Sequence, residues 1–177
     1  RIIDQWARYA PAGAQQWMDS RIAPEFRTRA NIELAESWAR LDPHAAEQWY
    51  EALPDNQRDP EIRNRIFRRW MEFESPTAIQ WLDSQTPSRD KDPLYEMAVE
   101  RANHQEPKVA AAWAERITDD KHRNRALEGV AWHWGRHDPA AMRDYVTAST
   151  MADDQKKRLT QYAEKRLQEQ AQQQQPR

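Results

Sequence analysis

The chain has 177 residues, of which 38% are hydrophobic and 32% are charged, and its formal net charge is −2. This balance argues against a dedicated nucleic-acid-binding protein, which needs a basic excess for its phosphate contacts, and no segment approaches the roughly 20 apolar residues of a membrane-spanning helix. The lack of cysteine excludes disulfides and thiolate metal sites, while nine tryptophans indicate a packed core and only three glycines leave little room for sheet.

Tryptophan recurs along the chain at a fixed spacing of 32 residues. One series, with an alanine in its fourth place, holds Trp6, Trp38, Trp70, Ala102 and Trp134. A second series lies 11 residues later and holds Trp17, Trp49, Trp81, Trp113 and Tyr145. A period of this length indicates stacked helical hairpins, because one hairpin cannot bury its apolar face alone.

Each copy predicts a longer helix A, a tight turn, a shorter helix B and a polar loop. Asp42-Pro43 and Asp138-Pro139 mark starts of helix B, since Asp caps free N–H groups and Pro fits the first turn. Ser75-Pro76 and Glu106-Pro107 are expected to do the same with different caps. The predicted buried stripes are Leu34, Ala35, Trp38 and Leu41, then Ala45, Trp49 and Leu53, then Ile66, Phe67, Trp70 and Phe73.

These copies predict an all-α fold: a right-handed α-α superhelix, or solenoid, of about five helix-turn-helix repeats with a C-terminal capping helix. The single predicted domain, 1–167, contains repeats at about 1–26, 27–58, 59–90, 91–122 and 123–150 and a capping helix at 152–170. In that last helix, Leu159, Tyr162 and Ala163 keep the inner face, and Arg166 places charge in the tryptophan position. The Gln-rich stretch 168–177 is interpreted as a frayed helix end or a linker.

The first residue, Arg1, falls inside a repeat, so we interpret the chain as a part of a larger protein. Any targeting segment would then lie upstream of it. The lack of cysteine fits the periplasm, and it also fits many cytosolic proteins.

Helix B of the second copy carries a small–aromatic–small pattern at Ala45, Trp49 and Ala52. Together with the paired antiparallel helices, this pattern resembles the tetratricopeptide-type solenoid, and the resemblance covers almost the whole chain. The unit is 32 residues long where that family has 34, and Trp38 lies late in helix A, where the family's tryptophan lies early. The resemblance implies a scaffold that binds peptides or proteins, usually on the concave face formed by the A helices.

Trp132 is the one tryptophan outside the two series. Its place in the other copies is filled by charged residues, namely Asp4, Glu36, Arg68 and Glu100. We therefore expect Trp132 to face solvent and to anchor a partner, since tryptophan is enriched at interface hot spots. The alternative is that it packs under the last loop or the capping helix. Met97, in a position that is otherwise Glu33, Arg65 or Gly129, is either a similar anchor or a partly exposed helix residue.

Four arginines crowd one helix A, and three of them, Arg65, Arg68 and Arg69, share a face at spacings of three and four. One interpretation is a binding patch for an acidic partner or a carboxylate. The other is a solvated face whose arginines pair with Glu61, Glu72 and Glu74.

His133 and His137 stand four residues apart, a spacing that can bind a metal from one helix face. The glutamate base of the zinc-protease pattern is missing between them, and a histidine at a helix C-terminus also suits the helix dipole. We predict no metal site here and keep His133 as a candidate partner contact.

No nucleophile and base stand in a recognisable pattern, and the glycine content is too low for a phosphate-cradling loop. The sequence therefore predicts a non-enzymatic scaffold, without a cofactor, that binds a protein or peptide partner. One alternative is a helical accessory module of a larger enzyme, such as a cell-wall lytic enzyme. A repeat protein that reads RNA is opposed by the net charge.

Overall fold

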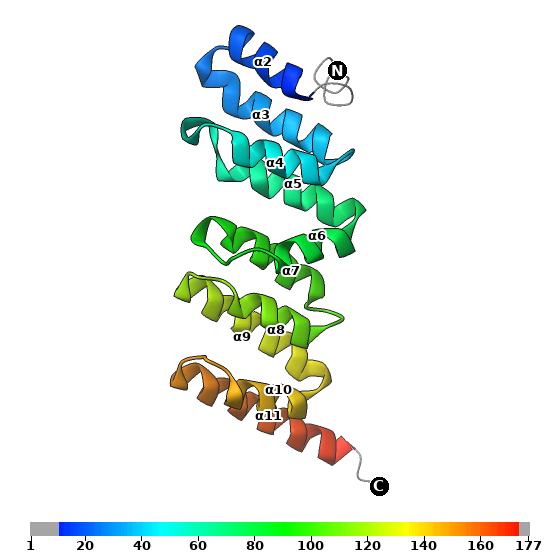
Figure 1. Ribbon diagram of the computed structural model, residues 1–177. Coiled ribbons are helices and arrows are strands. Elements are labelled where there is room, and N and C mark those ends of the chain that lie inside the picture. The colour runs from blue at the N-terminus through cyan, green and yellow to red at the C-terminus, as the bar shows by residue number, and fades with distance from the viewer. Residues whose placement is uncertain (1–10, 174–177) are drawn as a thin grey trace. The chain divides into compact units, whose positions relative to one another are not determined.

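A computed structural model describes residues 11–173, and within that range the chain is all-helical, without a strand. The prediction of an all-α fold is thus confirmed. The described residues up to Gln85 form one compact unit, and those from Thr86 form a second (Figure 1). The first predicted helix A, with Trp6, lies outside the described residues.

The first unit contains five α-helices and one 3-10 turn among its described residues. They are α2 (Pro11–Arg21), α3 (Pro24–Ala39), α4 (Pro43–Ala52), η1 (Asp55–Gln57), α5 (Pro60–Phe73) and α6 (Ser75–Asp83). The second unit contains η2 (Arg89–Lys91), α7 (Asp92–Ala102), α8 (Pro107–Glu115), α9 (Asp120–His137), α10 (Pro139–Ala148) and α11 (Asp153–Gln173). The last helix thus runs three residues past the predicted end at 170, into the Gln-rich stretch.

The short helices follow the 32-residue period more closely than the long ones. Helices α2, α4, α6, α8 and α10 begin at residues 11, 43, 75, 107 and 139, each 32 after the last. The long helices α3, α5, α7, α9 and α11 begin at 24, 60, 92, 120 and 153, at unequal intervals. The period is therefore fixed at the turn from helix A to helix B, while the polar loops between hairpins vary in length.

Aspartate caps two of the turns as predicted. The Asp42 and Asp138 side chains accept hydrogen bonds from the backbone N–H groups of Ala45 and Ala141, each at 2.9 Å. The predictions for the other two turns are wrong, because Ser75 is the first residue of α6 and the glutamates before α6 and α8 form no side-chain cap. Glutamate ranks outside the favoured N-cap residues, and the prolines alone mark these two helix starts.

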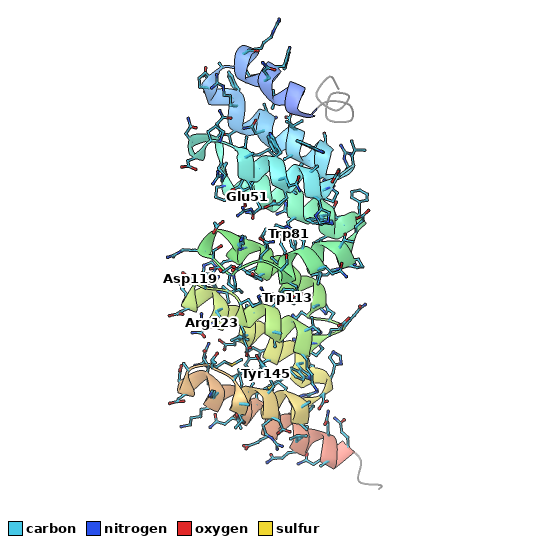
Figure 2. The ribbon with its side chains drawn as sticks, viewed as in Figure 1. Glu51, Trp81, Trp113, Asp119, Arg123 and Tyr145 are labelled. Atoms are coloured by element: carbon cyan, nitrogen blue, oxygen red, sulfur yellow. The ribbon has the colours of Figure 1, made fainter. Side chains whose placement is uncertain are left out.

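Each of the four hairpins from α3 to α10 is closed by contact between an aromatic of helix A and an aromatic of helix B. The ring centroids lie 5.9 Å apart for Trp38 and Trp49, 5.5 Å for Trp70 and Trp81, and 5.6 Å for Trp134 and Tyr145. Where the first series has alanine, Trp113 stacks instead on Tyr95 of α7, at 6.2 Å. Figure 2 labels Trp81, Trp113 and Tyr145 on α6, α8 and α10. The two tryptophan series therefore pair within a hairpin, which accounts for their constant offset of 11 residues.

The buried stripe of the second copy differs in part from the prediction. On α4 the most buried side chains are Ala46 and Tyr50, each one residue after the predicted Ala45 and Trp49, while Leu53, which follows α4, is buried as predicted. Leu41 and Phe73 are 52% and 62% exposed, which contradicts the prediction that they are buried. Both lie where helix A gives way to the turn, outside the reach of the neighbouring helix.

Arg63 belongs to the core of the first unit. Its side chain is 3% exposed, donates from Nε to Glu47 at 3.0 Å, pairs with Glu51 and lies over the ring of Tyr50 at 4.5 Å. Because a buried charge is costly unless it is paired, this ion pair fixes how α4 docks on α5.

A buried carboxylate organises the second unit in a comparable way. Asp92, at the start of α7, accepts hydrogen bonds from the backbone N–H groups of Thr118 and Asp119 at 2.7 and 2.9 Å, and from the Thr118 hydroxyl at 3.0 Å. These bonds tie α7 to the loop that leads into α9. Asp119 in turn caps α9, and the N–H groups of His122 and Lys121 help to lower the pKa of its carboxyl.

The capping difference between hairpins is testable with two matched variants. We expect Asp138→Ala to lower the free energy of unfolding of the second unit by about 1 kcal/mol, because it removes the cap of α10. Glu106→Ala, 32 residues earlier, removes a side chain that caps nothing and serves as the control. Urea unfolding followed by circular dichroism measures both, and equal losses would contradict this account of the turns.

Candidate partner-binding site

Helix α9 of the second unit keeps one face open to solvent. Arg125, Gly129, Trp132 and Arg136 follow one another at spacings of four, three and four residues, and all four are exposed. The opposite side of the helix is buried through Leu127, Val130, Ala131 and Trp134. The exposed row is called the α9 face below.

Trp132 stands in the middle of the α9 face and is 41% exposed. Its ring packs on Tyr162 of α11, with centroids 4.2 Å apart and planes at 56°. The geometry thus combines the two sequence interpretations, since the side chain reaches solvent and also contacts the capping helix. A large aromatic that is held in place on one side loses little conformational freedom when a partner covers the other.

Gly135 makes this contact possible. A Cβ atom at that position would lie 2.8 Å from Cε1 of Tyr162 and 2.7 Å from Cε of Met142. Only glycine lets the tyrosine ring approach the helix backbone this closely. Tyr162 therefore packs into the surface of α9 beside Trp132.

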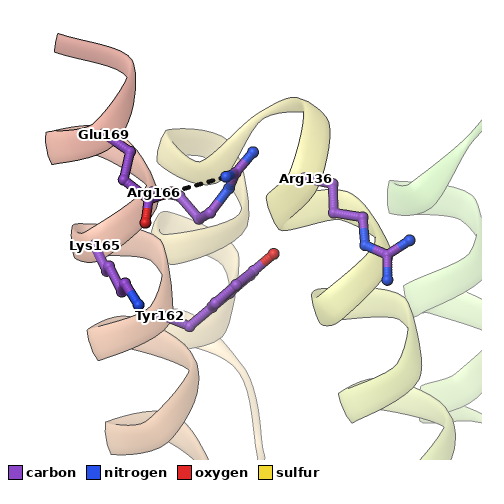
Figure 3. A pocket seen from close by; sticks show the side chains of 5 residues that line it. All are labelled: Arg136, Tyr162, Lys165, Arg166 and Glu169. Atoms are coloured by element: carbon purple, nitrogen blue, oxygen red, sulfur yellow. Dashed lines mark hydrogen bonds and ion pairs between the residues drawn. The ribbon is translucent and has the colours of Figure 1, made fainter. Parts of the chain in front are cut away.

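A pocket of about 440 Å³ opens between α9 and α11, as Figure 3 shows. Its lining residues are Arg136, Tyr162, Lys165, Arg166 and Glu169. Nη1 of Arg166 donates to Glu169 at 2.8 Å. Within the described part of the chain, Arg136 and Lys165 have no carboxylate partner. The pocket therefore carries more positive than negative charge.

A second hollow, of about 280 Å³, lies between α7 and α9. Two histidine contacts join α9 to α7 and to the turn after it. His122 Nδ1 lies 2.6 Å from Glu96 Oε1 of α7, and His104 Nδ1, in the turn that follows α7, lies 3.1 Å from His133 Nε2. Gly129 lines the hollow and leaves open space where a side chain would be. The α9 face thus has a hollow on each side.

His133 makes its closest ring contact with a histidine that the sequence did not single out. Its ring centroid lies 4.3 Å from that of His104 and 5.5 Å from that of His137. Burial of the ring, followed by the charges of His104, His137 and Arg136, lowers the pKa of His133. Among residues 11–173, no three His, Cys, Asp or Glu side chains gather so that they could hold a metal ion.

The predicted arginine patch lies in the first unit. Arg65 donates to Glu61 and Glu36 at 2.6 and 2.9 Å, and the hydrogen bond to Glu61 is the largest cause of its raised pKa. Arg69 pairs with Glu72 at 2.7 Å, and Arg68 is exposed. The arginines Arg65 and Arg69 therefore pair with glutamates, as the second interpretation of this face predicted. Glu74 differs from that interpretation, because it accepts a hydrogen bond from Thr77.

Met97 is half-buried on α7 and is not among the residues that line the hollow between α7 and α9. Of the six predicted contacts, Trp132 and His133 both lie on α9. Met97 lines neither hollow, and the three arginines belong to the other unit.

No family model matches the chain, and no curated protein or solved structure matches it. Among the helices that the structure describes, none is long and apolar enough to cross a membrane.

Sequence reasoning missed several members of the site, including His104, Arg136, Lys165 and the pairing of Tyr162 with Trp132. One signal for that pairing was present: Gly135 stands inside a predicted helix, where glycine costs stability unless something packs closely against it. No sequence pattern indicates that Arg136 and Lys165 lie close together, because their separation depends on how α11 packs on α9.

The two glycines of α9 give a matched test of the close approach. Gly129→Ala should raise the free energy of unfolding by up to about 1 kcal/mol, because its Cβ meets nothing within 4 Å and alanine favours helix. Gly135→Ala should lower it by about 1–3 kcal/mol, because the added carbon overpacks against Tyr162 and Met142. Urea denaturation of both variants checks the opposite signs, and a stabilising Gly135→Ala would refute the packing.

The lowered pKa of His133 predicts how the second unit responds to acid. The unfolded state takes up a proton near the ordinary value of about 6.5, and the folded state takes it up only at lower pH. This residue's stability contribution is therefore full above about pH 6.5 and is lost as the pH falls towards the folded pKa. We expect His133→Gln to flatten the loss of unfolding free energy between pH 7 and pH 5. An unchanged slope in that variant would contradict the prediction.

Proposed function

We propose that the chain is a non-enzymatic scaffold that binds a protein or peptide partner on the α9 face, with Trp132 as the anchor. The observation that carries this proposal is a half-exposed tryptophan, packed on Tyr162, between two hollows of one unit. Buried aromatic anchors dominate the binding energy of interfaces, and a ring held by its neighbour needs little ordering on binding.

We further propose that the hairpins belong to a solenoid of the tetratricopeptide-like type. The equal 32-residue spacing of the B-helix starts and the aromatic pairs inside the hairpins support this proposal. In such an array the A helices form the binding surface, and α7, α9 and α11 are the A helices that border the two hollows.

The proposal is tested with paired captures from the source organism. Wild type, Trp132→Ala and Phe26→Ala are immobilised at equal density; Phe26 is an exposed aromatic on α3 of the first unit and serves as the control. We expect at least one partner, retained by wild type and Phe26→Ala, to be lost with Trp132→Ala. Measured with purified partner, the loss should be about 2 kcal/mol, or roughly 30-fold in Kd.

Because Trp132 packs on Tyr162, a second variant separates binding from folding. Trp132→Leu keeps an apolar contact with Tyr162 but removes the indole, and circular dichroism checks that both variants remain helical. If a folded Trp132→Leu protein and a folded Trp132→Ala protein bind every captured partner as wild type does, the α9 face is not the binding surface.

A further inference from the structure

Three cationic side chains line the pocket between α9 and α11. Arg136 comes from α9, and Lys165 and Arg166 come from α11 (Figure 3). Glu169 is the one carboxylate among the lining residues, so the pocket carries a net charge of +2 in a chain whose net charge is −2. Like charges that share a pocket repel one another, and an anionic ligand relieves that repulsion.

The hydrogen bonds of Arg166 leave part of its guanidinium group without a partner. Its Nη1 is engaged by Glu169, but its Nε is buried and has no hydrogen-bond partner among the described residues. A buried donor without a partner is costly. Arg136 and Lys165, which lack a carboxylate partner in the described residues, add further donors at the same pocket.

We propose that this pocket binds the phosphoryl group of a phosphorylated peptide partner. This inference rests on the proposed function and specifies the chemistry of the partner. A phosphoserine or phosphothreonine carries a charge of about −1.5 to −2 at pH 7 and three acceptor oxygens, which match two uncompensated cations and several donors. A single carboxylate neutralises only half of that charge, and the acidic balance of the whole chain opposes the long polyanion of a nucleic acid.

Tyr162 connects the pocket to the anchor. It lines the pocket and carries the ring of Trp132 at 4.2 Å. A peptide whose phosphorylated residue enters the pocket therefore has an aromatic surface within reach of the neighbouring residue. In this arrangement the cations would bind the phosphoryl group, and the aromatic surface would pack against the neighbouring residue of the peptide.

The test uses the whole chain and three peptide libraries that differ at one fixed central residue: phosphoserine, serine or glutamate, with blocked ends. We expect at least tenfold greater retention of the phosphoserine library than of either other library. Lys165→Ala and Arg136→Ala should each lose most of that preference. Lys157→Ala removes an exposed lysine from the same helix, away from the pocket, and should keep it.

A second measurement asks whether the pocket takes the anion by itself. Inorganic phosphate should raise the Tm of wild type more than chloride does at equal ionic strength, and it should do so less for Lys165→Ala than for Lys157→Ala. Equal retention of the serine and phosphoserine libraries would overturn the proposal. So would equal retention of the glutamate library, or phosphate binding without any preference among peptides, or a preference for single-stranded RNA over the phosphoserine library.

The outcomes separate this inference from the proposed function. If a captured partner depends on Trp132 but not on Lys165 or on phosphatase treatment, the scaffold proposal stands and the phosphoryl pocket is rejected. If the phosphoserine preference depends on Lys165 but not on Trp132, the pocket stands and the tryptophan anchor is rejected.

Discussion

Contact between one aromatic of helix A and one aromatic of helix B, 11 residues later, closes three of the four hairpins whose two helices the structure describes. It appears as Trp38 on Trp49, Trp70 on Trp81 and Trp134 on Tyr145, with centroids between 5.5 and 5.9 Å. Because both partners must meet across the turn, the turn cannot change length without breaking the contact. The loops between hairpins have no such requirement, and the long helices that follow them begin at unequal intervals.

This constraint explains what could be read from the sequence. The period, the helical class and the caps at Asp42 and Asp138 are local or strictly periodic, so one chain is enough to predict them. The burial of Arg63 could not be predicted, because its partners Glu47 and Glu51 lie 16 and 12 residues away on another helix. The exposure of Leu41 and Phe73 also escapes periodicity, which continues the apolar stripe beyond the point where a neighbour covers it.

The candidate site also contains one residue that the sequence could identify and a pocket that it could not. Trp132 could be singled out because it breaks the repeat, with charged residues in its place in the other copies. The pocket beside it could not, because Arg136 and Lys165 belong to helices that meet only after α11 docks on α9. Arg166 was recognised as a charge in the tryptophan position of the capping helix, yet the sequence alone assigns it a solvating role. The docked structure adds that its Nε is buried without a partner.

Helix α11 buries one face against the α9–α10 hairpin and carries polar side chains on the other. On its inner face Leu159 and Ala163 are fully buried against α9 and α10. Arg166, in the position of the recurrent tryptophan, places a guanidinium at the pocket beside α9. Tyr162 stands where the earlier A helices have buried aliphatic side chains, and its larger ring reaches Trp132. The helix that packs on the α9–α10 hairpin therefore also supplies four of the five residues that line the pocket.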